Sequence, residues 1–153
     1  MIAPNSIAAI RTKRILLVED YEEARSMLAL NMRCFGYETI EAATGADAIE
    51  KASFDYPDLI VMDISLPDMT GIQAAKAIKG NPSTSHLPII AYSAWCTRSW
   101  MQEATNVGIV AYLVKPVPMA VMKETIEKFI LPANRQAALK PGNEVYPLPQ
   151  GAD

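Results

Sequence analysis

The feature of this sequence that most limits its possible folds is a short apolar run without alternation. Residues 58–63 read DLIVMD, so four consecutive apolar residues lie between two aspartates. A strand with one face in water alternates apolar and polar residues, whereas an uninterrupted run suits a strand buried on both faces of a parallel sheet. In such sheets, ligands and chemistry gather beyond the carboxyl ends of the strands. The pattern therefore predicts that Asp63 lies at the functional edge of a parallel sheet.

Three more apolar runs end in polar side chains. Because the carboxyl ends of parallel strands share one edge of the sheet, we expect these side chains to meet Asp63 there. The runs are residues 14–20 (RILLVED), ending in Glu19 and Asp20, residues 88–94 (PIIAYSA), ending in Ser93 and Ala94, and residues 109–116 (IVAYLVKP), ending in Lys115 and Pro116.

Helical patterns separate these runs. Gly36 suits a left-handed helix cap, and Thr44 suits the start of the next helix. Five β–α units predict an α/β fold with a doubly wound, five-stranded parallel sheet and five helices. One apolar stripe is expected at Ala24, Met27, Leu28, Met32 and Phe35. Strands are expected at about 14–19, 37–42, 59–62, 89–92 and 110–114, and helices at about 21–35, 45–53, 70–80, 95–106 and 118–130, with Asp68 or Thr70 opening the third helix.

Composition limits the classes of function. The chain has 153 residues, enough for one domain, and 50% of them are apolar. Its net charge is −3 and its basic residues are scattered, which argues against nucleic-acid binding. No apolar stretch approaches the ~18 residues of a membrane span. Cys34 and Cys96 lie far apart and outside a CxxC pattern, which favours reduced thiols in a cytoplasmic protein.

The two ends of the chain differ from its middle. Residues 1–12 lack the order of a signal peptide, because their basic residues follow the weakly apolar part. We expect them to form an N-terminal extension to a domain at residues 13–131. Residues 132–153 are rich in proline, which breaks helix and strand alike, so we expect a C-terminal tail there.

Over residues 13–131 the chain resembles the receiver domain of two-component response regulators, the CheY-like family. The resemblance implies the strand order 2-1-3-4-5. It is closest to stand-alone receivers, because the residues after 131 are too few for an output domain, so we expect a single-domain response regulator. The family's acidic pair falls on Glu19 and Asp20, its phosphorylated aspartate on Asp63, its Ser/Thr on Ser93, its switch aromatic on Tyr112 and its Lys-Pro motif on Lys115 and Pro116.

The resemblance implies that Asp63 accepts a phosphoryl group from a sensor histidine kinase or a histidine phosphotransfer protein. Clustered carboxylates repel an incoming phosphoryl group unless a divalent cation lies between them. Oxygen ligands alone suit Mg²⁺ or Mn²⁺ rather than zinc. By resemblance, Asp20 and Asp63 would bind the ion directly. Glu19 would bind it through water, and Ser65 through its backbone carbonyl.

The resemblance also implies a switch. Lys115 would pair with one phosphoryl oxygen, and Ser93 would donate a hydrogen bond to another. As Ser93 moves toward the phosphoryl group, Tyr112 can turn inward into the space that it leaves. The family holds its lysine before a cis proline, so the bond between Lys115 and Pro116 is expected to be cis.

The output surface of the family corresponds to the expected helix at 95–106, the strand at 110–114 and the last helix. DNA-binding members often carry acidic residues just before the switch aromatic, whereas this chain has apolar ones. An exposed apolar patch usually marks an interface, so we expect a downstream protein target or a homodimer on this surface. Its apolar candidates are Trp95, Trp100, Met101, Ile109, Val110, Ala111, Val117 and Met119. The alternative is that most of these side chains face the core of the domain.

Trp95 stands where the family often has a small, polar or charged side chain. It lies two residues beyond Ser93, and Ser65 lies two beyond Asp63, so both are expected to border the path of the hydrolytic water. A bulky indole there is expected to lengthen the lifetime of the acyl phosphate.

Other classes of protein fit less well. A haloacid-dehalogenase-type phosphatase needs a second aspartate at the position of Ser65, and a nucleotide-binding enzyme needs a glycine-rich loop that is absent. A flavodoxin-like carrier would not place EDYEEA, residues 19–24, beside a flavin phosphate. We expect self-phosphorylation and dephosphorylation with Mg²⁺ rather than an enzyme in the usual sense. A receiver-fold interaction module that phosphorylation does not regulate remains the alternative.

Overall fold

A computed structural model describes residues 11–130 of the chain, in which strands and helices alternate. The predicted C-terminal tail lies outside the described residues, as does most of the predicted N-terminal extension. The elements are β1 (Arg14–Val18), α2 (Glu22–Cys34), β2 (Glu38–Ala42), α3 (Gly45–Phe54), β3 (Leu59–Met62), α4 (Gly71–Gly80), β4 (Ile89–Ser93), α5 (Arg98–Asn106), β5 (Ala111–Val114) and α6 (Met119–Ile130).

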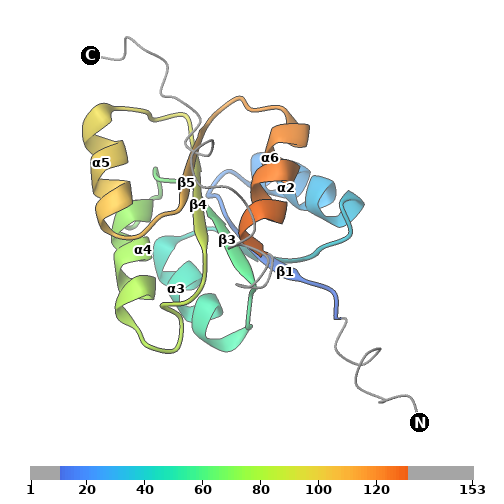
Figure 1. Ribbon diagram of the computed structural model, residues 1–153, viewed down its shortest axis with the longest axis horizontal. Helices are drawn as coiled ribbons and strands as arrows, with labels where there is room; N and C mark the ends of the chain where they lie inside the picture. The colour runs from blue at the N-terminus through green and yellow to red at the C-terminus, as the bar shows by residue number, and fades with distance from the viewer. Residues whose placement is uncertain (1–10, 131–153) are drawn as a thin grey trace.

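The five strands form one parallel sheet in the order β2-β1-β3-β4-β5. Figure 1 shows α2 and α6 on one face of this sheet and α3, α4 and α5 on the other. The predicted doubly wound α/β fold is therefore confirmed, as is the strand order that the resemblance implies. With all strands parallel, every strand delivers its last residue to the same edge.

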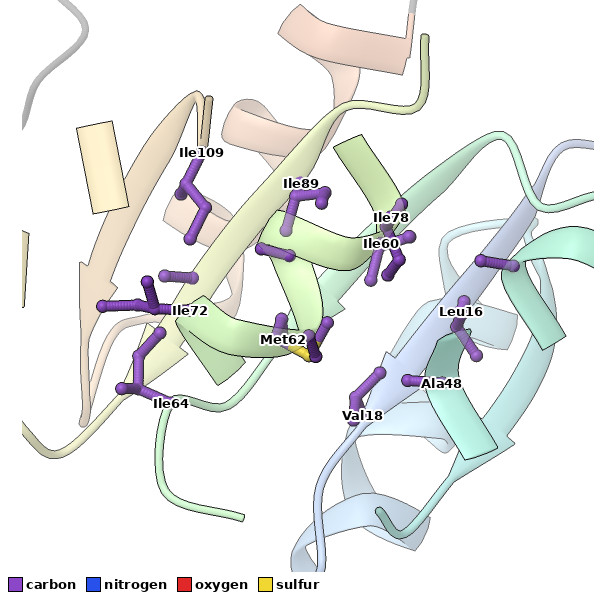
Figure 2. Packing of buried hydrophobic residues seen from close by; sticks show 14 of the residues in the cluster. Leu16, Val18, Ala48, Ile60, Met62, Ile64, Ile72, Ile78, Ile89 and Ile109 are labelled. Atoms are coloured by element: carbon purple, nitrogen blue, oxygen red, sulfur yellow. The ribbon is translucent and has the colours of Figure 1, made fainter. Parts of the chain in front are cut away.

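The unbroken apolar runs are explained by two cores, one on each face of the sheet. In β3, Ile60 and Met62 join the core under α3, α4 and α5, whereas Leu59 and Val61 join the core under α2 and α6. Figure 2 shows the first core, where Ile60 of β3 lies beside Ile78 of α4. Because every residue of β3 is at most 1% exposed, a polar side chain has no place in it before Asp63.

Threonine side chains begin three of the helices. Thr44 accepts a hydrogen bond from the backbone of Asp47, and Thr97 accepts one from Trp100. Thr70 forms a capping box with Gln73 at the start of α4. The helix expected at residues 95–106 therefore begins later than predicted, at Arg98, because the Thr97 cap fixes its first turn.

Asp68 does not begin α4. Its carboxylate accepts hydrogen bonds from the backbone of Gly45 and Ala46, at 2.8 and 2.9 Å, and so caps α3 across the sheet edge. Gly36 has a φ of 95° after α2, as its predicted left-handed cap requires. The expected strands and helices otherwise agree with the structure to within about two residues at each end.

The predicted stripe of α2 is wrong at one position. Leu28 and Met32 are buried against the sheet, but Met27 is 60% exposed at the rim of a hollow beside Lys115. The apolar face of α2 that packs on the sheet is therefore narrower than predicted. Ala29, rather than Met27, joins Leu28 and Met32 in the core. Among residues 11–130, no helix is long and apolar enough to cross a membrane. Cys34 and Cys96 are both free thiols.

Candidate functional site

Four parallel strands bring the predicted site residues to one edge of the sheet. Glu19 follows β1, Asp63 follows β3, Ser93 ends β4 and Lys115 follows β5. The pairing register aligns Val18 with Met62, and so places the acidic residues that follow them side by side. The sheet therefore assembles the cluster without help from a long loop.

Three carboxylates meet at this edge. Glu19, Asp20 and Asp63 each present an oxygen within 4.8 Å of the other two. Glu19 and Asp63 are buried, whereas Asp20 is exposed at the mouth of the cluster. The backbone N–H of Ser65 donates to Asp63 Oδ1 at 3.1 Å, which fixes the orientation of that carboxylate.

Lys115 lies against two of these carboxylates. Its Nζ is 2.9 Å from Glu19 Oε1 and 3.2 Å from Asp63 Oδ2. The Lys115 backbone N–H donates to the Ser93 carbonyl at 2.9 Å, and the peptide bond from Lys115 to Pro116 is cis. One ammonium thus bridges the carboxyl ends of β1 and β3 from the end of β5.

The environment separates the proton affinities of the two buried carboxyls. Burial, and then contact with Asp63, raises the pKa of Glu19 from its ordinary 4.5 to about 7. Burial also opposes ionisation of Asp63, but contact with Glu19, the hydrogen bond from the Ser65 N–H and the charge of Lys115 together hold the pKa of Asp63 below its ordinary value. Asp63 is therefore the carboxylate that stays ionised at neutral pH.

The Lys115 ammonium keeps its proton in this setting. Burial alone would lower its pKa, yet the hydrogen bond to Glu19 and the charge of Asp63 outweigh burial and raise the pKa. At neutral pH the cluster thus contains a fixed positive charge beside the ionised Asp63.

Ser93 and Tyr112 also lie close to Asp63. The Ser93 side chain is fully buried, and its Oγ accepts a hydrogen bond from the backbone of Trp95 at 3.2 Å. Tyr112 is 9% exposed, and its hydroxyl donates to the backbone carbonyl of Trp95. Burial raises the pKa of Tyr112 to about 12, so the hydroxyl keeps the proton that it donates. Tyr112 therefore already occupies the inward position in this structure.

The expected apolar output surface is smaller than its sequence indicates. Ile109 and Ala111 are buried, so they belong to the core of the sheet. Trp95 is 59% exposed and Val110 is 36% exposed. The other candidates, Trp100, Met101, Val117 and Met119, are partly buried against the two cores. The correction arises because helices cover both faces of the sheet: Ile109 packs in the core under α3, α4 and α5, and Ala111 packs in the core under α2 and α6.

Arg25 and Tyr92 also contact the site, and neither contact was predicted from the sequence. Arg25 of α2 donates to the Glu19 carbonyl at 2.9 Å and pairs with Glu41 at 3.3 Å. Tyr92 of β4 lies with its ring centroid 5.0 Å from Lys115 Nζ. An arginine one turn after the acidic pair is a signal for the first contact. The contact between Tyr92 and Lys115 depends on strand register, and the sequence does not distinguish Tyr92 from the other apolar residues of its strand.

The donor set fits a hard divalent cation. Glu19 Oε2 is buried and has no hydrogen-bond partner among the described residues. A buried carboxylate oxygen without a partner is costly, and a proton or a cation supplies what it lacks. Carboxylate oxygens, without nitrogen or sulfur ligands in the cluster, suit Mg²⁺ or Mn²⁺.

Comparison with known proteins shows the family. The model of the response regulator receiver domain matches residues 15–127, so this chain belongs to the response regulator receiver family. The polar-differentiation response regulator DivK of Brucella ovis is 33% identical over 119 residues, which cover 78% of this chain and 97% of the relative. DivK of Brucella anthropi is 32% identical over 118 residues, covering 77% of this chain and 96% of that protein.

Solved structures of the same family share the fold. The chemotaxis protein CheY4 of Vibrio cholerae superposes with a TM-score of 0.74 at 28% identity, covering 78% of this chain and 99% of that one. The receiver domain of a sensor histidine kinase from Pseudomonas aeruginosa PAO1 has a TM-score of 0.73 at 28% identity, covering 78% of this chain and 98% of that one. That receiver holds a magnesium ion in its active site cleft. The family is a phosphoacceptor signalling module rather than a classical enzyme.

Proposed function

We propose that this receiver accepts a phosphoryl group on Asp63 and thereby changes a protein-binding surface, as a cytoplasmic regulator in two-component signalling. The observation that carries the proposal is the meeting of the three carboxylates with Lys115 at one sheet edge. The phosphoryl donor would be a sensor histidine kinase or a histidine phosphotransfer protein. Both present a phosphoryl group on an imidazole nitrogen.

The transfer uses the Asp63 carboxylate as nucleophile. Its lowered pKa keeps it ionised at neutral pH. One Asp63 oxygen forms a bond to phosphorus while the bond from phosphorus to the donor nitrogen breaks, and the electron pair leaves with the nitrogen. The product is an acyl phosphate on Asp63. Lys115 already lies against Asp63 and would pair with a phosphoryl oxygen, and the Ser93 hydroxyl would donate to another.

The metal is part of the proposal. We assign direct contact with Mg²⁺, or Mn²⁺, to Asp20 and Asp63, contact through water to Glu19, and a backbone carbonyl ligand to Ser65. The bound cation supplies positive charge that offsets the repulsion between the carboxylates and the transferring group. The partnerless Glu19 Oε2 and the magnesium ion in the related receiver support this assignment.

The switch runs from Ser93 to the output surface. Ser93 accepts from the Trp95 backbone and Tyr112 donates to the Trp95 carbonyl, so one loop joins the two side chains. A phosphoryl group that draws Ser93 toward Asp63 would stabilise this inward Tyr112. The surface made by α5, β5 and α6 would then bind a downstream protein target or a second copy of the chain. Its exposed apolar contacts would be Trp95, just before α5, and Val110, just before β5.

Intact-mass spectrometry after incubation with acetyl phosphate and Mg²⁺ tests the proposal. The wild type should gain one phosphoryl group, and it should not do so with chelator present. Asp63→Asn should gain none, whereas Asp47→Asn, which alters an acid in the first turn of α3, should behave as the wild type does.

If the wild type shows no mass gain, the binding of beryllofluoride in the presence of Mg²⁺ is measured next. Beryllofluoride occupies the phosphoryl position without depending on the lifetime of an acyl phosphate. If neither a mass gain nor beryllofluoride binding occurs, the chain is a receiver-fold interaction module that phosphorylation does not regulate.

A further inference from the structure

The Lys115 ammonium lies over the aromatic ring of Tyr92. Tyr92 lies in β4, next to β5, and the register pairs it with Leu113, two residues before Lys115. Its ring centroid is 5.0 Å from Lys115 Nζ, within the range over which an ammonium is attracted to an aromatic face. The ring also packs on the core beneath α2 and α6, which fixes its position from the other side.

The contact between Tyr92 and Lys115 matters because the Lys115 side chain lies next to open space. A hollow of about 300 Å³ lies beside the ammonium, lined by Tyr92, Met27 and Met119 along with Glu19 and Asp63. The Lys115 side chain is 25% exposed, so it is not enclosed by close packing. A long side chain next to an open hollow has several rotamers available to it. Its position at Asp63 therefore depends on attraction rather than on steric confinement.

Within residues 11–130, the contacts of the ammonium are with its two carboxylates and with this ring. Glu19 and Asp63 are also the groups that the proposed function assigns to the metal and the phosphoryl group. Their negative charge would then be shared with the cation and the transferred group. The face of Tyr92 binds neither a metal ion nor a phosphoryl oxygen, so its attraction for the ammonium is unchanged by the reaction.

We propose that Tyr92 is a positioning residue, whose ring holds the Lys115 ammonium beside Asp63 for contact with the phosphoryl group. The inference rests on the proposed function and adds to it a residue that acts through Lys115. The aromatic face is the required property, so phenylalanine should replace tyrosine and an aliphatic side chain should not. From the strength of such contacts we expect loss of the ring to weaken beryllofluoride binding by about threefold to tenfold.

The test is calorimetric titration of the full chain with beryllofluoride at saturating Mg²⁺, comparing Tyr92→Phe, Tyr92→Leu and Tyr37→Leu with the wild type. Tyr37 is a matched control because it packs, partly buried, against the same core as Tyr92. The inference predicts weaker binding in Tyr92→Leu alone. It is overturned if Tyr92→Leu binds as the wild type does, if Tyr92→Phe loses as much as Tyr92→Leu, or if Tyr37→Leu shows the same loss. Tyr92→Met replaces Tyr92→Leu if the latter does not fold.

A second readout needs neither metal nor phosphoryl analogue. A proton above an aromatic face is shifted upfield in the NMR spectrum, so the Lys115 side-chain methylenes should be upfield in the wild type and in Tyr92→Phe. They should return to ordinary positions in Tyr92→Leu. An unchanged Lys115 spectrum in Tyr92→Leu overturns the inference. If the wild type shows the shift but binds no beryllofluoride, the proposed function has failed while the contact itself stands.

Discussion

Glutamine in place of Glu19 keeps the size of the side chain and removes its charge, which isolates the effect of one buried proton. The folded protein raises the pKa of Glu19 from 4.5 to about 7. At roughly 1.4 kcal/mol for each pH unit, that difference corresponds to about 3 kcal/mol. The Glu19 side chain is 8% exposed, so solvent screens this effect little.

The sign follows from linkage between protonation and folding. Between pH 4.5 and 7 the unfolded chain has released the Glu19 proton and the folded protein has kept it, so the stability of the folded protein falls as pH rises. This contribution is fully present below pH 4.5 and is lost as pH passes through about 7. In Glu19→Gln it is absent at every pH. Relative to the wild type, the variant should therefore gain about 3 kcal/mol between pH 4.5 and 8.

Urea denaturation followed by circular dichroism, in chelator at several values of pH, measures this difference. Comparing the two proteins at each pH removes the contributions of the carboxyls that do not contact Glu19, which both proteins share. Asp63 does contact Glu19, but its pKa is held below its ordinary value of 3.8, so it stays ionised from pH 4.5 to 8. An excess of Mg²⁺ at pH 8 should restore stability to the wild type, because a ligand that binds only the folded protein stabilises it. A difference between the two proteins that does not change with pH would refute the reasoning.

Three further predictions use single substitutions. A Cβ at Gly71 would overlap the carbonyl oxygen of Asp63 and lie 2.9 Å from its carbonyl carbon. Gly71→Ala should therefore lower the thermal midpoint of unfolding and impair phosphorylation. Gly80→Ala should do neither, because a Cβ at Gly80 would lie in open space. Backbone hydrogen bonds to α3 lower the pKa of Asp68, so Asp68→Asn should destabilise at pH 7, and the loss seen in urea denaturation should shrink as pH falls below 3.8. Trp95, 59% exposed, lines a hollow that also contains Ser65, so Trp95→Ala should hasten dephosphorylation severalfold; an equal rate would remove the shielding role.

Much of this architecture could be predicted from the sequence because the strands are buried on both faces. The run at residues 59–62 has no polar residue and is fully buried in the structure. The fold class of the domain and the position of Asp63 at the sheet edge both follow from this run. The same rule brings Glu19, Ser93 and Lys115 to one edge. Parallel strands of similar length align their ends, and this alignment does not depend on side-chain detail.

Features that depend on which way a side chain points were harder to predict. Met27 fits a helical stripe by spacing but lies outward, and Ile109 is buried although the residue after it is exposed. Asp68 lies near the start of α4, yet it caps α3, a contact between residues more than 20 positions apart. The contact between Tyr92 and Lys115 likewise requires the register of β4 and β5. Such contacts follow from tertiary packing, which local sequence patterns do not encode.

The central claim is that Asp63 carries the phosphoryl group, and chemical trapping tests it most directly. After incubation with acetyl phosphate and Mg²⁺, reduction with borohydride converts an aspartyl phosphate to homoserine, and peptide mass mapping locates the change. The account predicts homoserine at position 63 in the wild type, none in chelator and none in Asp63→Asn. Homoserine at another position, or none at any position in a wild type that has gained a phosphoryl mass, would contradict it.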